Sequence, residues 1–173
     1  MSENNSQNEI VVVDYEFPNG DRYRGETVDS VKQGTGEYRF KGGDIYFGEF
    51  NKGVFHGKGI LSYKDGSKYE GEFVGGKKEG FGTFILPNDD KYEGNFFENK
   101  FNGDGTYYFT SGERYEGKFN EGQFSGYGVF YYNNGNRYEG NWENDKKNGK
   151  GKFIFVDGKI FSSKWKDDCI VSK

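Results

Sequence analysis

The sequence lacks the features that mark several large classes of protein. Cys169 is the only cysteine, which excludes an internal disulfide. No stretch approaches the roughly 18 consecutive apolar residues of a membrane-spanning helix. The first nine residues are polar and lack the apolar core of a signal peptide. We therefore expect an intracellular protein of a reducing compartment, without a transmembrane segment.

Residues with catalytic or ligand-binding chemistry are equally scarce. The single histidine, His56, lies far from Cys169 in sequence, and neither has the spacing of a metal site. The repeated Gly-x-Gly phrases lack the third glycine of a dinucleotide-binding loop, and no Gly-Lys-Ser/Thr closes a P-loop. Carboxylates recur with a sequence repeat, whereas a catalytic pair should be unique. The sequence thus predicts a protein that is not an enzyme, with no catalytic residue, no metal and no cofactor.

The charge balance argues against nucleic acid as a partner. The chain has 24 Lys and Arg against 28 Asp and Glu, a net charge of −4, whereas nucleic-acid-binding proteins present a basic face. Apolar residues make up only 32% of the chain, a level typical of disordered segments. However, 20% of the residues are aromatic and the 29 glycines recur at fixed positions. We therefore expect an ordered fold.

A repeat of 23 residues runs through the chain. Six tyrosines are spaced at this interval, and Phe161 continues the series: Tyr23, Tyr46, Tyr69, Tyr92, Tyr115 and Tyr138. Most of them open the phrase Tyr-Glu-Gly-x-Phe/Trp. A fixed period of this size indicates one supersecondary unit stacked on copies of itself. We expect a disordered polar tail over 1–9, a repeat array over 10–166 with six full units from Tyr23 and half-units at both ends, and a C-terminal tail over 167–173.

Each unit alternates with period two, which predicts two β-strands. Tyr69 and Phe73, for example, share one face of the first strand of their unit. Residues 64–66 fit a three-residue hairpin loop. This loop pairs Leu61 with Tyr69 and places the rings of both strands on one face, since a slip of one residue would reverse every side chain. The glycine-rich connection over about 74–80 is expected to be longer.

The repeated phrase Tyr-Glu-Gly-x-Phe, followed by Gly-x-Gly-x-Tyr/Phe, resembles the MORN (membrane occupation and recognition nexus) repeat. The resemblance extends from about Tyr15 to Trp165 and implies an all-β fold, an elongated single-layer antiparallel meander of stacked β-hairpins. Cell-wall choline-binding arrays are an alternative, although their periods are shorter and their phrases rich in tryptophan. The histidine common in the inner loop of MORN repeats is His56 here, but other residues replace it elsewhere: Gln33, Glu79, Asn102, Ser125 and Asn148.

Proteins that resemble this chain are scaffolds, so the resemblance implies a non-catalytic rod for protein–protein interaction. The favoured setting is a ciliary or flagellar axoneme, as a radial spoke-like component, or another cytoskeletal assembly. The alternative is a membrane-associated scaffold that binds anionic phospholipid or tethers membranes. The lysines expected to contact lipid headgroups are Lys77, Lys78, Lys146, Lys147 and Lys150. A homodimer through an exposed terminal strand is a further expectation.

The aromatic face of the predicted sheet is expected to bind a protein partner, such as a helix laid across it. A single-layer sheet has no second layer to cover this face, and contiguous exposed apolar surface marks interaction sites. The residues expected to contact the partner are Tyr46, Phe50, Tyr69, Phe73, Phe84, Tyr92, Phe96, Tyr107, Tyr115, Phe119, Phe130, Tyr138 and Trp142.

Overall fold

The computed structural model describes residues 9–172, and over this range every regular element is a β-strand. The all-β prediction is confirmed. The polar tail expected over 1–9 lies almost entirely outside the described residues. None of the described residues belongs to a helix that is long and apolar enough to cross a membrane.

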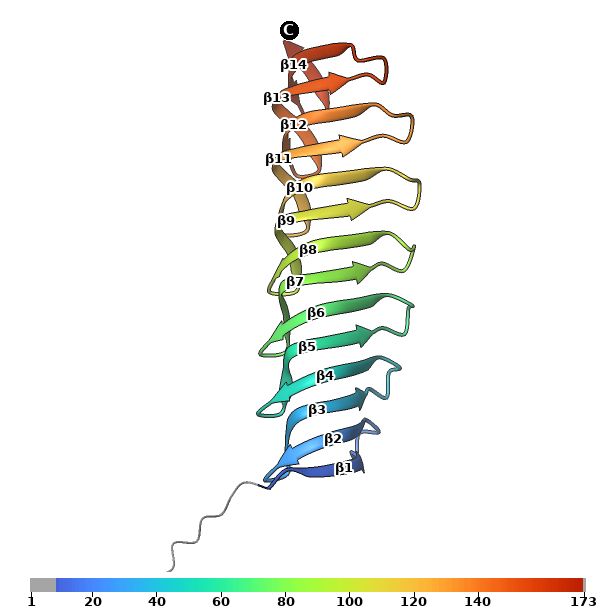
Figure 1. Ribbon diagram of the computed structural model, residues 1–173, viewed down its shortest axis with the longest axis vertical. Helices are drawn as coiled ribbons and strands as arrows, with labels where there is room; N and C mark the ends of the chain where they lie inside the picture. The colour runs from blue at the N-terminus through green and yellow to red at the C-terminus, as the bar shows by residue number, and fades with distance from the viewer. Residues whose placement is uncertain (1–8, 173) are drawn as a thin grey trace, which may run out of the picture. The chain divides into compact units, whose positions relative to one another are not determined.

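The chain divides into two compact units, residues 1–78 and 79–173. In each unit, antiparallel strands follow one another in chain order within one sheet (Figure 1). The strands of the first unit are β1 (Val11–Glu16), β2 (Arg22–Val28), β3 (Val31–Arg39), β4 (Ile45–Asn51), β5 (Val54–Ser62) and β6 (Lys68–Val74). β7 (Lys77–Ile85) begins in the first unit with Lys77 and Lys78 and continues in the second. The other strands of the second unit are β8 (Lys91–Phe97), β9 (Lys100–Tyr108), β10 (Arg114–Asn120), β11 (Gln123–Tyr131), β12 (Arg137–Glu143), β13 (Lys146–Ile154), β14 (Ile160–Lys166) and β15 (Cys169–Ser172).

The three-residue hairpin loop is confirmed. The amide of Tyr63 donates to the carbonyl oxygen of Ser67 at 2.9 Å, and the amide of Gly66 donates to that of Tyr63 at 3.0 Å. Leu61 consequently lies opposite Tyr69 in the pair β5–β6, as the loop length predicts. In the corresponding loop of the second unit, Asp89 replaces the glycine and adopts a φ of 65°, which aspartate tolerates better than most residues. This loop fixes the face on which every ring lies.

The connection expected to be a long loop is instead a two-residue turn with a β-bulge beside it. Between β10 and β11 only Glu121 and Gly122 lie outside the strands, with φ of 53° and 90°, the positive values of a type I′ turn. The register then shifts, because Gly117 pairs with Gly128 whereas Lys118 pairs with Ser125. The prediction was wrong because the glycine-rich segment resembles a loop in sequence but remains hydrogen-bonded to its neighbour.

The bulge bends the strand pair in which it lies, because extra residues on one strand strengthen the local twist and turn the strand. At the bulge of β11, Gly126 has a φ of 60°, a conformation that glycine adopts without strain. Figure 1 shows the strands curling at this end of each hairpin. The bend folds the far end of the hairpin back over the tyrosine of the same 23-residue repeat.

The C-terminal segment 167–173 was expected as a tail but contains a strand. Residues Cys169–Ser172 form β15, which pairs with β14 through Ile170 and Trp165. At the opposite end of the chain, Val11–Val13 belong to β1, in agreement with a leading strand there. Exposed apolar residues such as Val12 and Val171 occur in both terminal strands.

Candidate functional site

Each repeat is organised around one buried tyrosine, of which Tyr115 is an example. Its ring is stacked on Phe124 with centroids 3.8 Å apart and planes at 10°. The edges of Phe119 and Trp142 meet it at 5.3 Å each. Its hydroxyl donates to the carbonyl oxygen of Lys118 at 3.1 Å. Burial raises the pKa of Tyr115, so this hydroxyl stays protonated and can donate.

Most residues predicted to contact a partner are therefore core residues. The six repeat tyrosines are at most 1% exposed, and the Phe or Trp four positions after each from Tyr46 onward is at most 6% exposed. The buried members of the predicted set are Tyr46, Phe50, Tyr69, Phe73, Tyr92, Phe96, Tyr115, Phe119, Tyr138 and Trp142. Phe84, Tyr107 and Phe130 are half-buried and reach the surface. The prediction placed the rings on one face correctly, but the bent hairpin covers ten of them.

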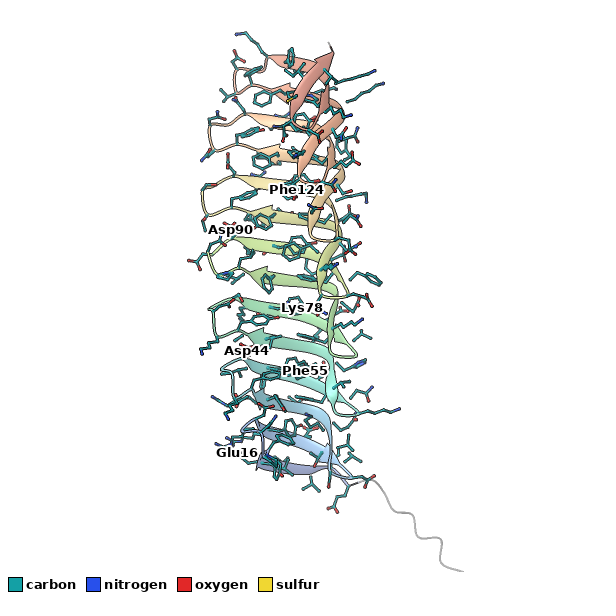
Figure 2. The ribbon with its side chains drawn as sticks, turned by 180° about the vertical axis from the view of Figure 1, so that it is seen from behind. Glu16, Asp44, Phe55, Lys78, Asp90 and Phe124 are labelled. Atoms are coloured by element: carbon teal, nitrogen blue, oxygen red, sulfur yellow. The ribbon has the colours of Figure 1, made fainter. Side chains whose placement is uncertain are left out.

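The residue that covers each tyrosine was missed by the sequence analysis. It lies nine positions after the tyrosine and is either phenylalanine or lysine: Lys32, Phe55, Lys78, Phe101, Phe124 and Lys147. The phenylalanines stack on their tyrosines, with centroids 3.7 Å apart for Tyr46–Phe55. Figure 2 labels Phe55 and Lys78 in the first unit, along the bent side of the hairpins. We call these six residues the covering positions. Because these positions recur every 23 residues, the sequence repeat could have revealed them.

The covering lysines place an ammonium group among aromatic rings. The Nζ of Lys32 lies 4.3 Å from the ring centroid of Tyr38, and that of Lys78 lies 5.1 Å from Tyr63 and 5.4 Å from Tyr69. Such distances allow cation–π attraction. Burial lowers the pKa of Lys78 to about 8. Burial also lowers the pKa of Lys32, against the opposing field of Asp21.

In each unit, partly or fully exposed apolar side chains at and next to the covering positions form a surface, which we call the inner face. In the second unit Phe109 contacts Phe130 at 5.7 Å between centroids, and Tyr132 contacts Phe153 at 5.5 Å. The inner-face residues of the first unit are Tyr38, Phe40, Phe55, Leu61 and Tyr63; those of the second are Phe84, Leu86, Phe101, Tyr107, Phe109, Phe130, Tyr132, Phe153 and Phe155. These rings contact one another yet remain partly open to solvent.

Acidic side chains at the hairpin loops hold one end of the inner face in place. Asp90, 6% exposed, accepts hydrogen bonds from the Thr110 amide at 2.8 Å and from the Tyr107 hydroxyl at 2.9 Å. Burial by itself would raise the pKa of Asp90, but these bonds and one from Asn88 outweigh it and lower the pKa. Asp21 makes the equivalent bonds in the first unit. These contacts join the loops of Asp21 and Asp90 to the loops that follow them and fix the ring between.

The outer face, on the other side of the sheet, is charged and solvated. Arg114 contacts Glu116 at 2.6 Å, and Arg137 contacts Glu139 at 2.7 Å. Exposed pairs of this kind contribute little to stability. The bulge residues Phe81 and Tyr127 also project from this face, 61% and 57% exposed, but they are isolated from each other by two repeats. Tyr108 and Tyr131 share this face, each beside a cation: Lys91 lies 4.3 Å from the Tyr108 ring centroid and Arg114 3.8 Å from that of Tyr131.

The five lysines predicted to contact lipid divide into two groups. Lys77, Lys146 and Lys150 are exposed. Lys78 and Lys147 are half-buried at covering positions, and the Nζ of Lys147 lies 5.5 Å from the ring of Tyr138 and 3.7 Å from Asp168. Within residues 9–172 there is no group of three His, Cys, Asp or Glu that could hold a metal ion.

Comparison with known proteins identifies the repeat. The family model of the MORN repeat matches five consecutive segments, residues 46–68, 69–91, 92–114, 115–137 and 138–160. No curated protein matches the chain.

Among solved structures, the chain is similar to the SAS-4 (dCPAP) TCP domain of Drosophila melanogaster in complex with a proline-rich motif of Ana2 (dSTIL), with 12% identity, a TM-score of 0.58, and 91% of this chain and 89% of that chain covered. It is also similar to the TCP10c domain of Drosophila melanogaster Sas-4, with 13% identity, a TM-score of 0.52, and coverage of 91% and 98%. At these identities both likenesses concern the fold alone.

Proposed function

Because the chain belongs to the MORN repeat family, we propose that it is a non-catalytic scaffold whose inner face binds another protein. The family itself favours a role in protein interaction and indicates no enzymatic activity. The observation that carries the proposal is a row of partly exposed rings, which contact one another from Tyr107 to Phe155. Contiguous apolar surface of this kind is characteristic of interaction sites.

The rings of the inner face differ in role from the tyrosines beneath them. The buried tyrosines stabilise each repeat, whereas Phe109, Tyr132 and Phe155 present part of their area to solvent. Aromatic side chains supply large contact area at low cost in conformational entropy, which is why they dominate binding hot spots. The structurally similar SAS-4 domain is in complex with a proline-rich motif of a second protein, which supports a polypeptide as the ligand class.

A capture experiment with a matched control tests the proposal. The full-length chain is used as bait in extract from its own cells, and captured proteins are identified by mass spectrometry. The double variant Phe109→Ser/Tyr132→Ser removes two inner-face rings and should lose the partner. Phe81→Ser/Tyr127→Ser removes two rings of the outer face in the same unit and should retain it. If both folded variants lose the partner equally, or if both retain it, the inner face is excluded as the binding site.

The setting we propose is a ciliary or flagellar axoneme, with a radial spoke-like or other cytoskeletal role. This part of the proposal is supported by the resemblance to stand-alone MORN scaffolds of axonemes. The tagged protein should co-purify with detergent-extracted axonemes or cytoskeletons and remain after membranes are removed. Release with the membrane fraction would contradict this setting.

A membrane-associated scaffold is the second candidate, and one cluster favours it. On the outer face, Lys150 lies directly opposite Lys164 across β13 and β14, and Lys152 follows two residues later. Like charges in such a pair are destabilising unless an anion neutralises them. Clustered lysines attract anionic headgroups. Pelleting with phosphatidylserine vesicles at low salt, lost in Lys150→Gln/Lys164→Gln, would support lipid binding; a protein that stays in the supernatant would exclude it.

A further inference from the structure

The covering positions of the first unit alternate between charge and ring in the order Lys32, Phe55, Lys78. They occupy the same place in consecutive repeats, so each is two strands from the next. Neighbouring strands lie about 4.7–4.9 Å apart, which gives a step of about 9.5 Å between covering positions. The two ammonium groups are therefore about 19 Å apart along the sheet, with an aromatic ring between them.

This step matches one regular form of polypeptide. A polyproline II helix has three residues per turn and rises about 3.1 Å per residue, or about 9.3 Å per turn. Every third residue of such a chain, laid across the strands, faces the next repeat. An α-helix rises about 1.5 Å per residue, and 9.5 Å does not correspond to a whole number of its turns. Aromatic surfaces are also the usual docking sites for polyproline II segments.

The charges of the inner face specify the chemistry further. The ammonium group of Lys32 is half-buried among Phe17, Tyr38 and Tyr23. The carboxylate that acts on it, Asp21, already accepts hydrogen bonds from the Tyr38 hydroxyl and the Lys41 amide. The Nζ of Lys78 also lies close to aromatic rings, 5.1 Å from the centroid of Tyr63 and 5.4 Å from that of Tyr69. A desolvated cation gains most from an opposite charge supplied by a ligand.

We propose that the inner face of the first unit binds a proline-rich segment in the polyproline II conformation, with acidic residues six positions apart and an apolar residue midway. The two carboxylates contact the ammonium groups of Lys32 and Lys78, and the apolar side chain packs on Phe55. The second unit carries Phe101, Phe124 and Lys147 at its covering positions and lacks this charge pattern. The inference rests on the proposed function and specifies the partner of the same face.

Labelled synthetic peptides and fluorescence anisotropy test the pattern with the full-length chain. The reference peptide contains Glu-Pro-Pro-Leu-Pro-Pro-Glu. Replacing both glutamates with glutamine, or deleting one proline so that the acids are five positions apart, should weaken binding at least about tenfold. Equal affinity for the three peptides would overturn the proposal. So would tighter binding of an α-helical peptide that carries its acids 12 or 13 residues apart.

Variants locate the site. Lys32→Phe/Lys78→Phe gives both positions the residue found at Phe55, and it should lose at least about tenfold in affinity for the acidic peptide while the glutamine peptide is unaffected. Lys147→Phe, the same change in the second unit, should leave both affinities unchanged. If the lysine variants still capture the cellular partner and the ring variants do not, the scaffold function holds and the acidic ligand is wrong. If the double variant fails to fold, the peptide comparison on the natural chain still decides.

Discussion

A Cβ atom added to Gly117 would lie 2.6 Å from the hydroxyl oxygen of Tyr115. A Cβ atom added to the paired glycine, Gly128, would come even closer to the same hydroxyl oxygen. The tyrosine therefore lies flat on bare backbone, with Phe124 on its other side. This packing, rather than the turns, requires the two paired glycines in such a repeat.

Gly117→Ala should consequently destabilise the protein by about 2–4 kcal/mol, because the ring has no room to move between backbone and Phe124. Thermal or denaturant unfolding measures the change. Gly42→Ala is the control, since its added methyl group would meet nothing within 4 Å, and it should change the stability by less than about 0.5 kcal/mol. Similar losses in the two variants would refute the close packing of Tyr115.

Lys78→Phe should stabilise the chain by about 1 kcal/mol. The substitution removes a desolvated charge and restores the tyrosine–phenylalanine stack seen at Phe55, Phe101 and Phe124, a contact worth about 0.5–1.5 kcal/mol. The midpoint of denaturant unfolding should rise without a change in slope. A lower midpoint would show that the lysine is preferred at this covering position for stability.

The same lysine predicts a pH dependence. Burial lowers the pKa of Lys78 from 10.5 to about 8, so between these values the unfolded chain binds more protons at this group than the folded chain. Stability contributed by this site must then rise with pH over that window. The buried tyrosines counteract this rise in stability only above about pH 10, where tyrosine in the unfolded chain ionises.

Unfolding of the natural chain and of Lys78→Met at pH 7 and pH 9.5 isolates this contribution. The stability advantage of Lys78→Met should be largest at pH 7 and should shrink by pH 9.5. Lys64→Met, at an exposed position, serves as the comparison. An advantage that stays constant or grows with pH would contradict the burial of the Lys78 ammonium group.

Asp90→Ala should cost about 2–3 kcal/mol, because it leaves the Thr110 amide and the Tyr107 hydroxyl without their charged acceptor. Glu113→Ala alters the same position of the next repeat, where the carboxylate accepts a bond from Ser111 at 3.3 Å, and should cost less than about 0.5 kcal/mol. Since its folded pKa is lowered, the contribution of Asp90 should be lost as the pH falls through that pKa. Equal costs for the two variants would contradict this role.

The sequence by itself determined the repeat and the strand pairing. The spacing from Tyr69 to Tyr92 defined the unit, and the loop at residues 64–66 fixed the pairing of Leu61 with Tyr69. Both follow from local chemistry, because a turn residue sets the register and the register sets the face.

Only the tertiary structure decided which rings are buried. Tyr115 and Phe130 lie on one face of the sheet by the same alternation, yet the first is buried and the second reaches solvent. The difference arises at the bulge of Gly126, which bends the hairpin and brings Phe124 onto Tyr115. The period of two predicts the face of a side chain, but its exposure depends on what a distant part of the hairpin places above it.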